Sequence, residues 1–120
     1  MITAVTDENF EHEVLESDLP CVIGFTAGWC NLCPQMIGEM DALSQKYDDE
    51  VKFCSVNIDE QRKLRILFAV AALPYTVFVQ DGMKTPLFDE LVTEDRLDER
   101  IRYVLDGGKC PTTVPLRKMR

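Results

Sequence analysis

The sequence is short of basic residues, has a single histidine and contains no long apolar run, and these shortages exclude several classes of protein. It has 13 Lys and Arg residues against 21 Asp and Glu residues, which gives a net charge of −8. Nucleic acids and anionic membrane surfaces attract clustered Lys and Arg, so we expect neither as a partner. No apolar stretch is long enough to span a bilayer. Residues 1–10 lack the basic start and apolar run of a signal peptide, so we expect a cytoplasmic protein.

The length and the distribution of charge suggest one domain with a short tail. The chain has 120 residues, of which 46% are hydrophobic, and this suits a single core. The end of the chain is basic, because residues 107–120 hold Lys109, Arg117, Lys118 and Arg120 and no acid. We therefore predict a folded domain over residues 1–106 and a basic, irregular tail over residues 107–120. We interpret the tail as a mobile terminus, although it could also fold back on the acidic body.

Hydrophobic spacing predicts strands that alternate with helices and then close in a hairpin. Thr6, Asp59 and Thr93 are suitable N-caps for helices. Asp81-Gly82 is a strong signal for a hairpin turn. Pro86 indicates that the strand after this turn lies at an edge of the sheet. The predicted strands span residues 2–5, 21–26, 51–58, 75–80 and 83–89, and the predicted helices follow Thr6, span 30–47 and 59–70, and follow Thr93. This order predicts an α/β fold with a mixed central sheet and helices on both faces.

Each predicted helix has an apolar face that should turn towards the sheet. On the first helix this face holds Phe10, Val14 and Leu15. The faces of the later helices are Met36, Ile37, Met40 and Leu43; Leu64, Leu67 and Phe68; and Leu97, Ile101, Val104 and Leu105.

The residues that point to chemistry are Cys30 and Cys33, which follow a buried strand and open a predicted helix. A helix N-terminus offers unpaired N–H groups and partial positive charge, which stabilise a thiolate. A thiolate is the attacking species in disulfide exchange, and a second thiol one turn away can close a disulfide. We therefore predict that Cys30 is the exposed nucleophile and that Cys33 is the more buried resolving thiol.

The other cysteines do not form a second close pair. Structural zinc sites usually use two close pairs of ligands, whereas Cys54, Cys110 and His12 are isolated in the sequence, so we expect no metal site. Cys21 and Cys54 lie in predicted strands, where free cysteine behaves as a small buried hydrophobe. Cys110 lies in the basic tail and is interpreted as an incidental thiol, although it could also attack Cys30 or cross-link two chains.

These features occur in an order that resembles the thioredoxin family over residues 2–106. The matching segments are VTDENFEHEVLESDLP, CVIGFTAGWCNLC, VNIDE, and Leu73-Pro74 followed by a strand and Asp81-Gly82. The resemblance implies the thioredoxin fold and a thiol–disulfide oxidoreductase that acts on protein disulfides. It implies no bound cofactor, and an upstream electron donor similar to thioredoxin reductase. It also implies a cis Leu73–Pro74 bond beside a substrate-binding surface of Trp29, Asn31, Leu32, Ala72, Leu73 and Pro74.

The sequence departs from the family pattern at five places. Gly24 stands where the family has a buried Asp that is thought to help deprotonate the resolving thiol. Ser55 stands where the family has the buried Lys that pairs with this Asp. Gly38 replaces a helix-kinking Pro, Glu90 replaces a Gly of the substrate groove, and Asn31-Leu32 replaces the usual Gly-Pro. These losses leave an alternative open, in which the fold is a protein-binding module whose cysteine pair is redox-silent or regulatory.

Overall fold

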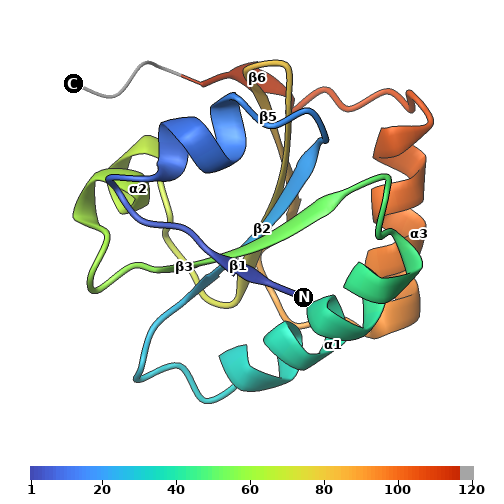
Figure 1. Cartoon of the computed structure of the whole chain (residues 1–120). Helices are drawn as coiled ribbons and strands as arrows, with labels where there is room; N and C mark the ends of the chain where they lie inside the picture. Colours follow the sequence, from blue (N-terminus) through green and yellow to red (C-terminus); the bar gives the residue numbers. More distant parts are fainter. Residues whose placement is uncertain (117–120) are drawn as a thin grey trace.

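The computed structural model describes residues 1–116, and its centre is a six-stranded mixed sheet (Figure 1). The strand order is β1-β3-β2-β4-β5-β6, with parallel pairing among the first three strands and antiparallel pairing among the rest. This confirms the predicted α/β fold. The elements in chain order are β1 (Thr3–Ala4), η1 (Glu11–Leu15), β2 (Cys21–Thr26), α1 (Cys33–Lys46), β3 (Lys52–Asn57), α2 (Arg62–Leu67), β4 (Tyr75–Gln80), β5 (Met83–Phe88), α3 (Glu94–Leu105) and β6 (Val114–Pro115).

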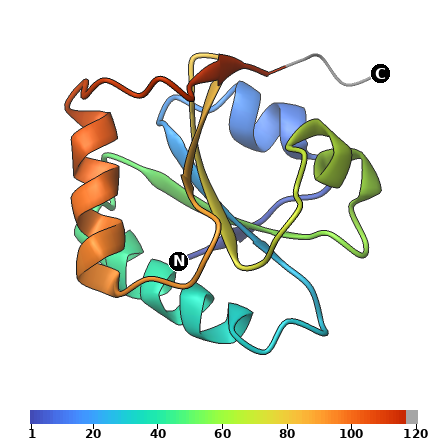
Figure 2. The ribbon, with the colours of Figure 1, turned by 180° about the vertical axis from the view of Figure 1, so that it is seen from behind.

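Helices cover both faces of the sheet and bury an apolar cluster on each (Figures 1 and 2). On one face, η1 and α2 pack Phe10, Leu64 and Phe68 against β2 and its neighbours. On the other face, α1 and α3 enclose a cluster that includes Met40 and Ile101. A central strand with both faces buried is apolar at every position, which explains the continuous run of residues 21–25. Within residues 1–116, no helix is both long and apolar enough to cross a membrane.

The first helix differs from the prediction in its type. Thr6 does cap the segment, because its Oγ1 accepts a hydrogen bond from Asn9 N while Asn9 Oδ1 accepts one from Thr6 N. However, η1 is a π-helix with wider turns, as the bond from Glu16 N to Glu11 O spans five residues. The wider turn carries Leu15 out of the buried face, so its side chain is 43% exposed and the prediction for Leu15 is wrong.

The next two helices begin later than predicted. Helix α1 begins at Cys33 rather than Cys30, because Pro34 has no N–H and is accommodated only in a first turn. Helix α2 begins at Arg62, and Asp59 does not cap it. Instead, the carboxylate of Asp7 accepts hydrogen bonds from the N–H groups of Lys63 and Leu64, so the cap comes from a distant segment.

The end of the chain adds a strand that the sequence did not predict. β6 pairs with β5 through the partners Met83–Pro115 and Lys84–Val114, so the prediction of an irregular tail is wrong for these two residues. The preceding strand β5 stops at Phe88, one residue earlier than predicted, which places Glu90 in the bend beyond it. The basic residues Arg117, Lys118 and Arg120 lie outside the described residues.

Candidate active site

Three segments of the chain meet at one end of the sheet. β2 and β3 run parallel and end side by side, with Thr26 opposite Asn57. β4 runs antiparallel to β2, and its first residue Tyr75 lies opposite Phe25. The loops after β2 and β3 and the loop before β4 therefore converge, so residues 27–33, 58–61 and 70–74 share one edge.

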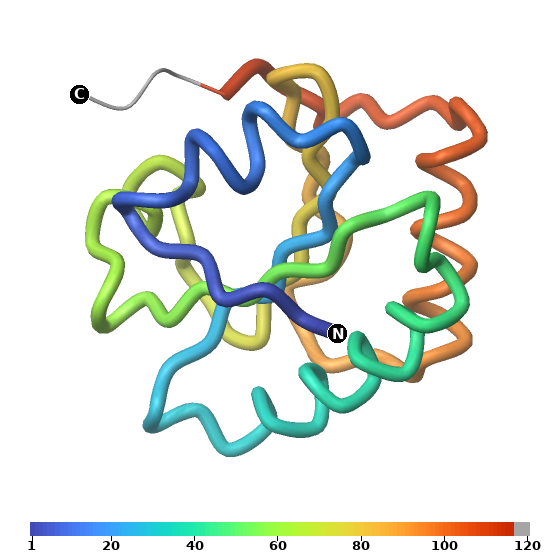
Figure 3. The backbone as a smooth tube through the Cα atoms, in the orientation of Figure 1, coloured from blue at the N-terminus to red at the C-terminus, as the bar shows by residue number. Residues whose placement is uncertain are grey.

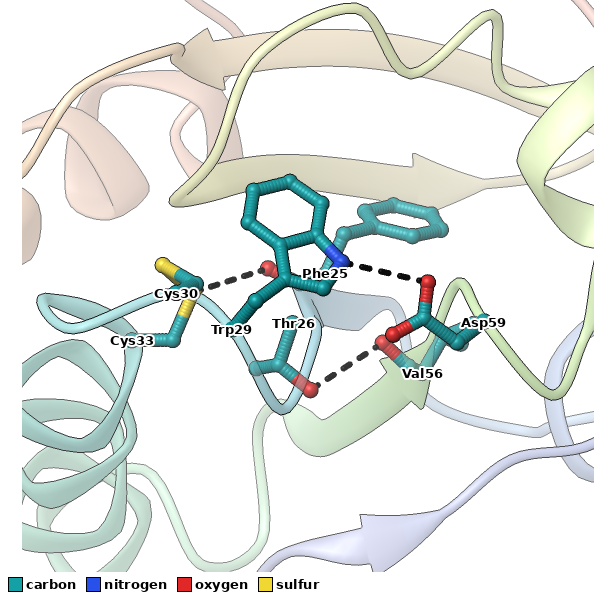
Figure 4. Close-up of a disulfide and its surroundings, with 7 residues drawn as sticks. All are labelled: Phe25, Thr26, Trp29, Cys30, Cys33, Val56 and Asp59. Atoms are coloured by element: carbon teal, nitrogen blue, oxygen red, sulfur yellow. Dashed lines mark hydrogen bonds between the residues drawn. A yellow bond between two sulfur atoms is a disulfide. The ribbon is translucent and has the colours of Figure 1, made fainter.

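Cys30 and Cys33 lie in the first of these loops and form a disulfide (Figure 4). Their Cα atoms are 5.5 Å apart, within the range that a disulfide requires. Cys30 stands in the turn before α1, since its N–H donates to Ala27 O and its carbonyl accepts from Cys33 N. The pair is thus held by the loop on one side and by the first turn of α1 on the other.

The two cysteines differ in their exposure. Cys30 is 9% exposed and Cys33 is 2% exposed. Cys33 also lies against the end of β2, where its Sγ is 3.9 Å from the carbonyl oxygen of Phe25. Cys30 is therefore the more accessible of the pair, although it is far less exposed than the residues on either side of it.

Two large apolar side chains flank Cys30 and stand in solvent. Trp29 is 65% exposed and Leu32 is 51% exposed, and Asn31 between the cysteines is exposed as well. The indole Nε1 of Trp29 donates a hydrogen bond of 3.3 Å to Asp59 Oδ1, which ties the cysteine loop to the loop after β3 (Figure 4).

Asp59 is a site residue that sequence reasoning missed. Its position after Asn57 and Ile58 in the sequence predicts only a helix cap. The signal that identifies it is topological, because the carboxyl ends of two adjacent parallel strands meet at one edge of the sheet.

The loop before β4 completes the same end of the sheet. The Leu73–Pro74 peptide bond is cis, as the resemblance implied. Pro74 is buried, Leu73 is half-buried against the core on the η1 side, and Ala72 is exposed. The register of β4 with β2 brings this loop to the end of the sheet that carries the disulfide.

Gly24 and Ser55 lie side by side in the sheet, because they are register partners on β2 and β3. The space beside Gly24 is filled by α1. A Cβ atom at residue 24 would lie 2.6 Å from Sδ of Met40 and 2.9 Å from Cε of Met36. The space beside Gly24 is therefore occupied by two thioether side chains.

The remaining cysteines lie elsewhere. Cys21 and Cys54 are fully buried in the same apolar cluster, and contact with Cys21 together with burial raises the pKa of the Cys54 thiol. Cys110 is half-buried in the C-terminal segment, and the tube in Figure 3 shows residues 106–112 on the opposite side of the molecule from residues 27–33. This placement leaves Cys110 out of reach of Cys30. Among residues 1–116, no three Cys, His, Asp or Glu side chains are grouped as metal ligands.

Comparison with known proteins gives a consistent picture. The family model Thioredoxin matches residues 1–103. A thioredoxin of Rickettsia typhi is 39% identical over 82 residues, which cover 68% of this chain and 78% of that protein. Thioredoxin 1 of Synechococcus elongatus is 36% identical over 81 residues, which cover 68% of this chain and 76% of that protein. Thioredoxin 1 of a Nostoc species is 29% identical over 97 residues, which cover 81% of this chain and 91% of that protein.

Proposed function

This chain belongs to the thioredoxin family, and on that premise we propose that it is a protein-disulfide reductase that cycles Cys30 and Cys33 between dithiol and disulfide. Its general chemistry is thiol–disulfide exchange, which the family and the close cysteine pair both support. The observation that carries the specific proposal is the Cys30–Cys33 disulfide beside two exposed apolar side chains, with Cys30 as the more exposed of the two cysteines.

The proposed cycle uses each cysteine once. The Cys30 thiolate attacks a substrate disulfide, forms a mixed disulfide and releases the first substrate thiolate. The Cys33 thiolate then attacks Sγ of Cys30, releases the second substrate thiolate and leaves the Cys30–Cys33 disulfide. An upstream dithiol donor similar to thioredoxin reductase returns two electrons and two protons, which restores both thiols. No bound cofactor takes part in these steps.

We propose that the substrate docks on the surface around the disulfide. Trp29, Asn31 and Leu32 supply one side of this surface and residues 72–74 supply the other. The exposure of two large apolar side chains beside Cys30 supports this assignment, because such side chains gain free energy when a partner covers them. The backbone next to Pro74 is suited to pair with an extended substrate segment.

We further propose that the cycle runs in the cytoplasm. Three cysteines, Cys21, Cys54 and Cys110, are free thiols in the structure. Free thiols persist in reducing compartments, whereas oxidising compartments favour disulfides. A reducing compartment also supplies the electrons that a protein-disulfide reductase must pass on.

The direct test is reduction of insulin disulfides with dithiothreitol as the electron source. We expect Cys30→Ser to lose all activity above the uncatalysed rate, because the attacking sulfur is gone. Cys33→Ser should accumulate a mixed disulfide on Cys30, which mass spectrometry detects. Cys110→Ser is the matched control and should keep the wild-type rate. Full activity of Cys30→Ser would refute the proposal.

A second measurement separates this function from the alternative of a binding module. The Cys30–Cys33 pair is equilibrated with glutathione or dithiothreitol, and free thiols are trapped and counted. A two-electron transition at a strongly reducing potential, absent from Cys30→Ser, supports a reductase, whereas a much more oxidising potential indicates disulfide formation or sensing. A chain that never forms the intramolecular disulfide in solution, and turns over no substrate, would act as a binding module instead.

A further inference from the structure

A cavity of about 600 Å³ is lined by residues of β5, α3 and the segment 109–112. The ribbon shows these segments together on the side of the molecule away from residues 27–33 (Figure 2). This volume is within the range of small-molecule sites, about 300–1,000 Å³. The charged side chains that line it are Arg96, Glu99, Arg100 and Lys109, so the lining has three positive charges and one negative charge. Such a lining is unusual in a protein whose net charge is −8.

Arg96 and Arg100 are one helical turn apart and share a single aromatic ring. Their guanidinium carbons lie 5.1 and 5.0 Å from the centre of the Phe88 ring. Stacking on the ring fixes the position of both groups and leaves their N–H donors free to bind a ligand.

The two guanidinium groups form no ion pair with the rest of the described chain. Within residues 1–116, no carboxylate lies within 4.0 Å of either group. By contrast, Arg102 on the same helix is paired with Glu50 and Asp106. Like charges four residues apart destabilise a helix, and an anion placed between them removes that repulsion.

The C-terminal wall of the cavity is held in place by several contacts. Tyr103 donates a hydrogen bond of 2.9 Å to the carbonyl of Lys109, and the hydroxyls of Thr85 and Thr113 lie 2.7 Å apart. Gly108 crosses the Tyr103 ring so closely that a Cβ atom there would lie 2.4 Å from ring carbons. Together with the pairing of β6 to β5, these contacts make the cavity a formed site.

From this arrangement we propose that the cavity binds a small organic oxyanion, a molecule whose carboxylate or phosphate group lies between Arg96 and Arg100 with Lys109 as a third cation. Guanidinium groups bind both kinds of oxyanion through paired N–H donors. The site is separate from the disulfide, so this binding does not depend on the proposed reductase activity.

The first experiment is calorimetric titration of the full oxidised chain at low ionic strength with two probes, inorganic phosphate and citrate. We expect saturable binding of at least one probe, and the stronger probe identifies the oxyanion as phosphate or carboxylate. Arg96→Gln and Arg100→Gln should each weaken binding about tenfold or more, because each removes a charge-assisted hydrogen bond. Arg65→Gln, the same exchange on α2 outside the cavity, should bind as the wild type does.

A second readout uses the thiol of Cys110, which lines the cavity and is the one free cysteine that is not buried. The probe that binds should slow the alkylation of Cys110 by iodoacetamide in the wild type and leave the rate unchanged in Arg96→Gln/Arg100→Gln. The double variant should keep the wild-type rate of insulin reduction. Absence of saturable binding by both probes, or equal binding by wild type and double variant, would overturn the proposal.

Discussion

Replacing Gly24 by Asp would place a carboxyl group where α1 leaves no room for a side chain. The new Cβ would lie 2.6 Å from Sδ of Met40 and 2.9 Å from Cε of Met36. Both atoms are far ends of flexible side chains, so they can move, but only within a closely packed core. Overpacking costs about 1–3 kcal/mol, and burying a polar group without full hydrogen bonding costs about 1–3 kcal/mol. We therefore expect Gly24→Asp to lower the free energy of unfolding by about 2–6 kcal/mol.

The chain offers a matched control in Gly38→Asp. Gly38 is exposed on α1, and a Cβ atom there would meet no atom within 4 Å. The same exchange should therefore change the free energy of unfolding by less than about 0.5 kcal/mol. Urea unfolding of both variants and the wild type at several pH values measures the difference.

The pH dependence gives a second check on Gly24→Asp. Burial raises the pKa of the introduced carboxyl above the ordinary value of about 4. The folded state then binds the proton more tightly than the unfolded state, so the destabilisation should grow as the pH rises above about 4. Equal stability of the two variants at every pH would refute the conclusion that Met36 and Met40 fill the site.

The same variant addresses the resolving step of the proposed cycle. A carboxylate at residue 24 would be adjacent in sequence to Phe25, whose carbonyl oxygen lies 3.9 Å from Sγ of Cys33, and it would add a base to this part of the core. We expect the folded Gly24→Asp protein to release a mixed disulfide on Cys30 faster than the wild type does, as measured by stopped-flow reaction with an aromatic disulfide. An unchanged release rate would mean that a carboxylate at residue 24 does not deprotonate Cys33.

Three further predictions concern other parts of the molecule. Asp7→Ala should lower the free energy of unfolding by about 1 kcal/mol in urea, because it removes the cap of α2; an unchanged value would refute the capping role. Burial and the hydrogen bond to Asp98 raise the pKa of Tyr47 to about 12, so stability should fall as the pH rises from 10 to 12, and the fall should be absent in Tyr47→Phe. Reduction should raise the fluorescence of Trp29, the single tryptophan, because the neighbouring disulfide quenches the indole, whereas Cys30→Ser should show no change.

The sequence predicted the central strands and the cysteine loop well because local signals specify them. The run of residues 21–25 is apolar throughout, and the structure places it in a central strand buried on both faces. Asp81-Gly82 forms the expected turn between β4 and β5, with positive φ at both residues. Likewise, Cys30 and Cys33 are close in sequence and lie between a buried strand and the start of a helix, and this setting predicts the disulfide that the structure contains.

Other features depended on residues that are distant in sequence. The cap of α2 comes from Asp7, more than 50 residues away, so no local pattern could assign it. The hydrogen bond from Trp29 to Asp59 can be predicted only when the pairing of β2 with β3 is known. The strand β6 has only two residues, and it forms because the chain after α3 returns along β5.

The shortness of β1 and β6 affects how this sheet meets other molecules. An edge strand exposes unpaired N–H and C=O groups on which another chain can add a strand. Here both edges are two residues long, and Pro115 at the β6 edge has no N–H to offer. Pro86 interrupts the part of β5 that β6 leaves uncovered. Within residues 1–116, these two edge strands therefore offer few unpaired backbone groups to a chain that would add a strand, which disfavours sheet growth through them.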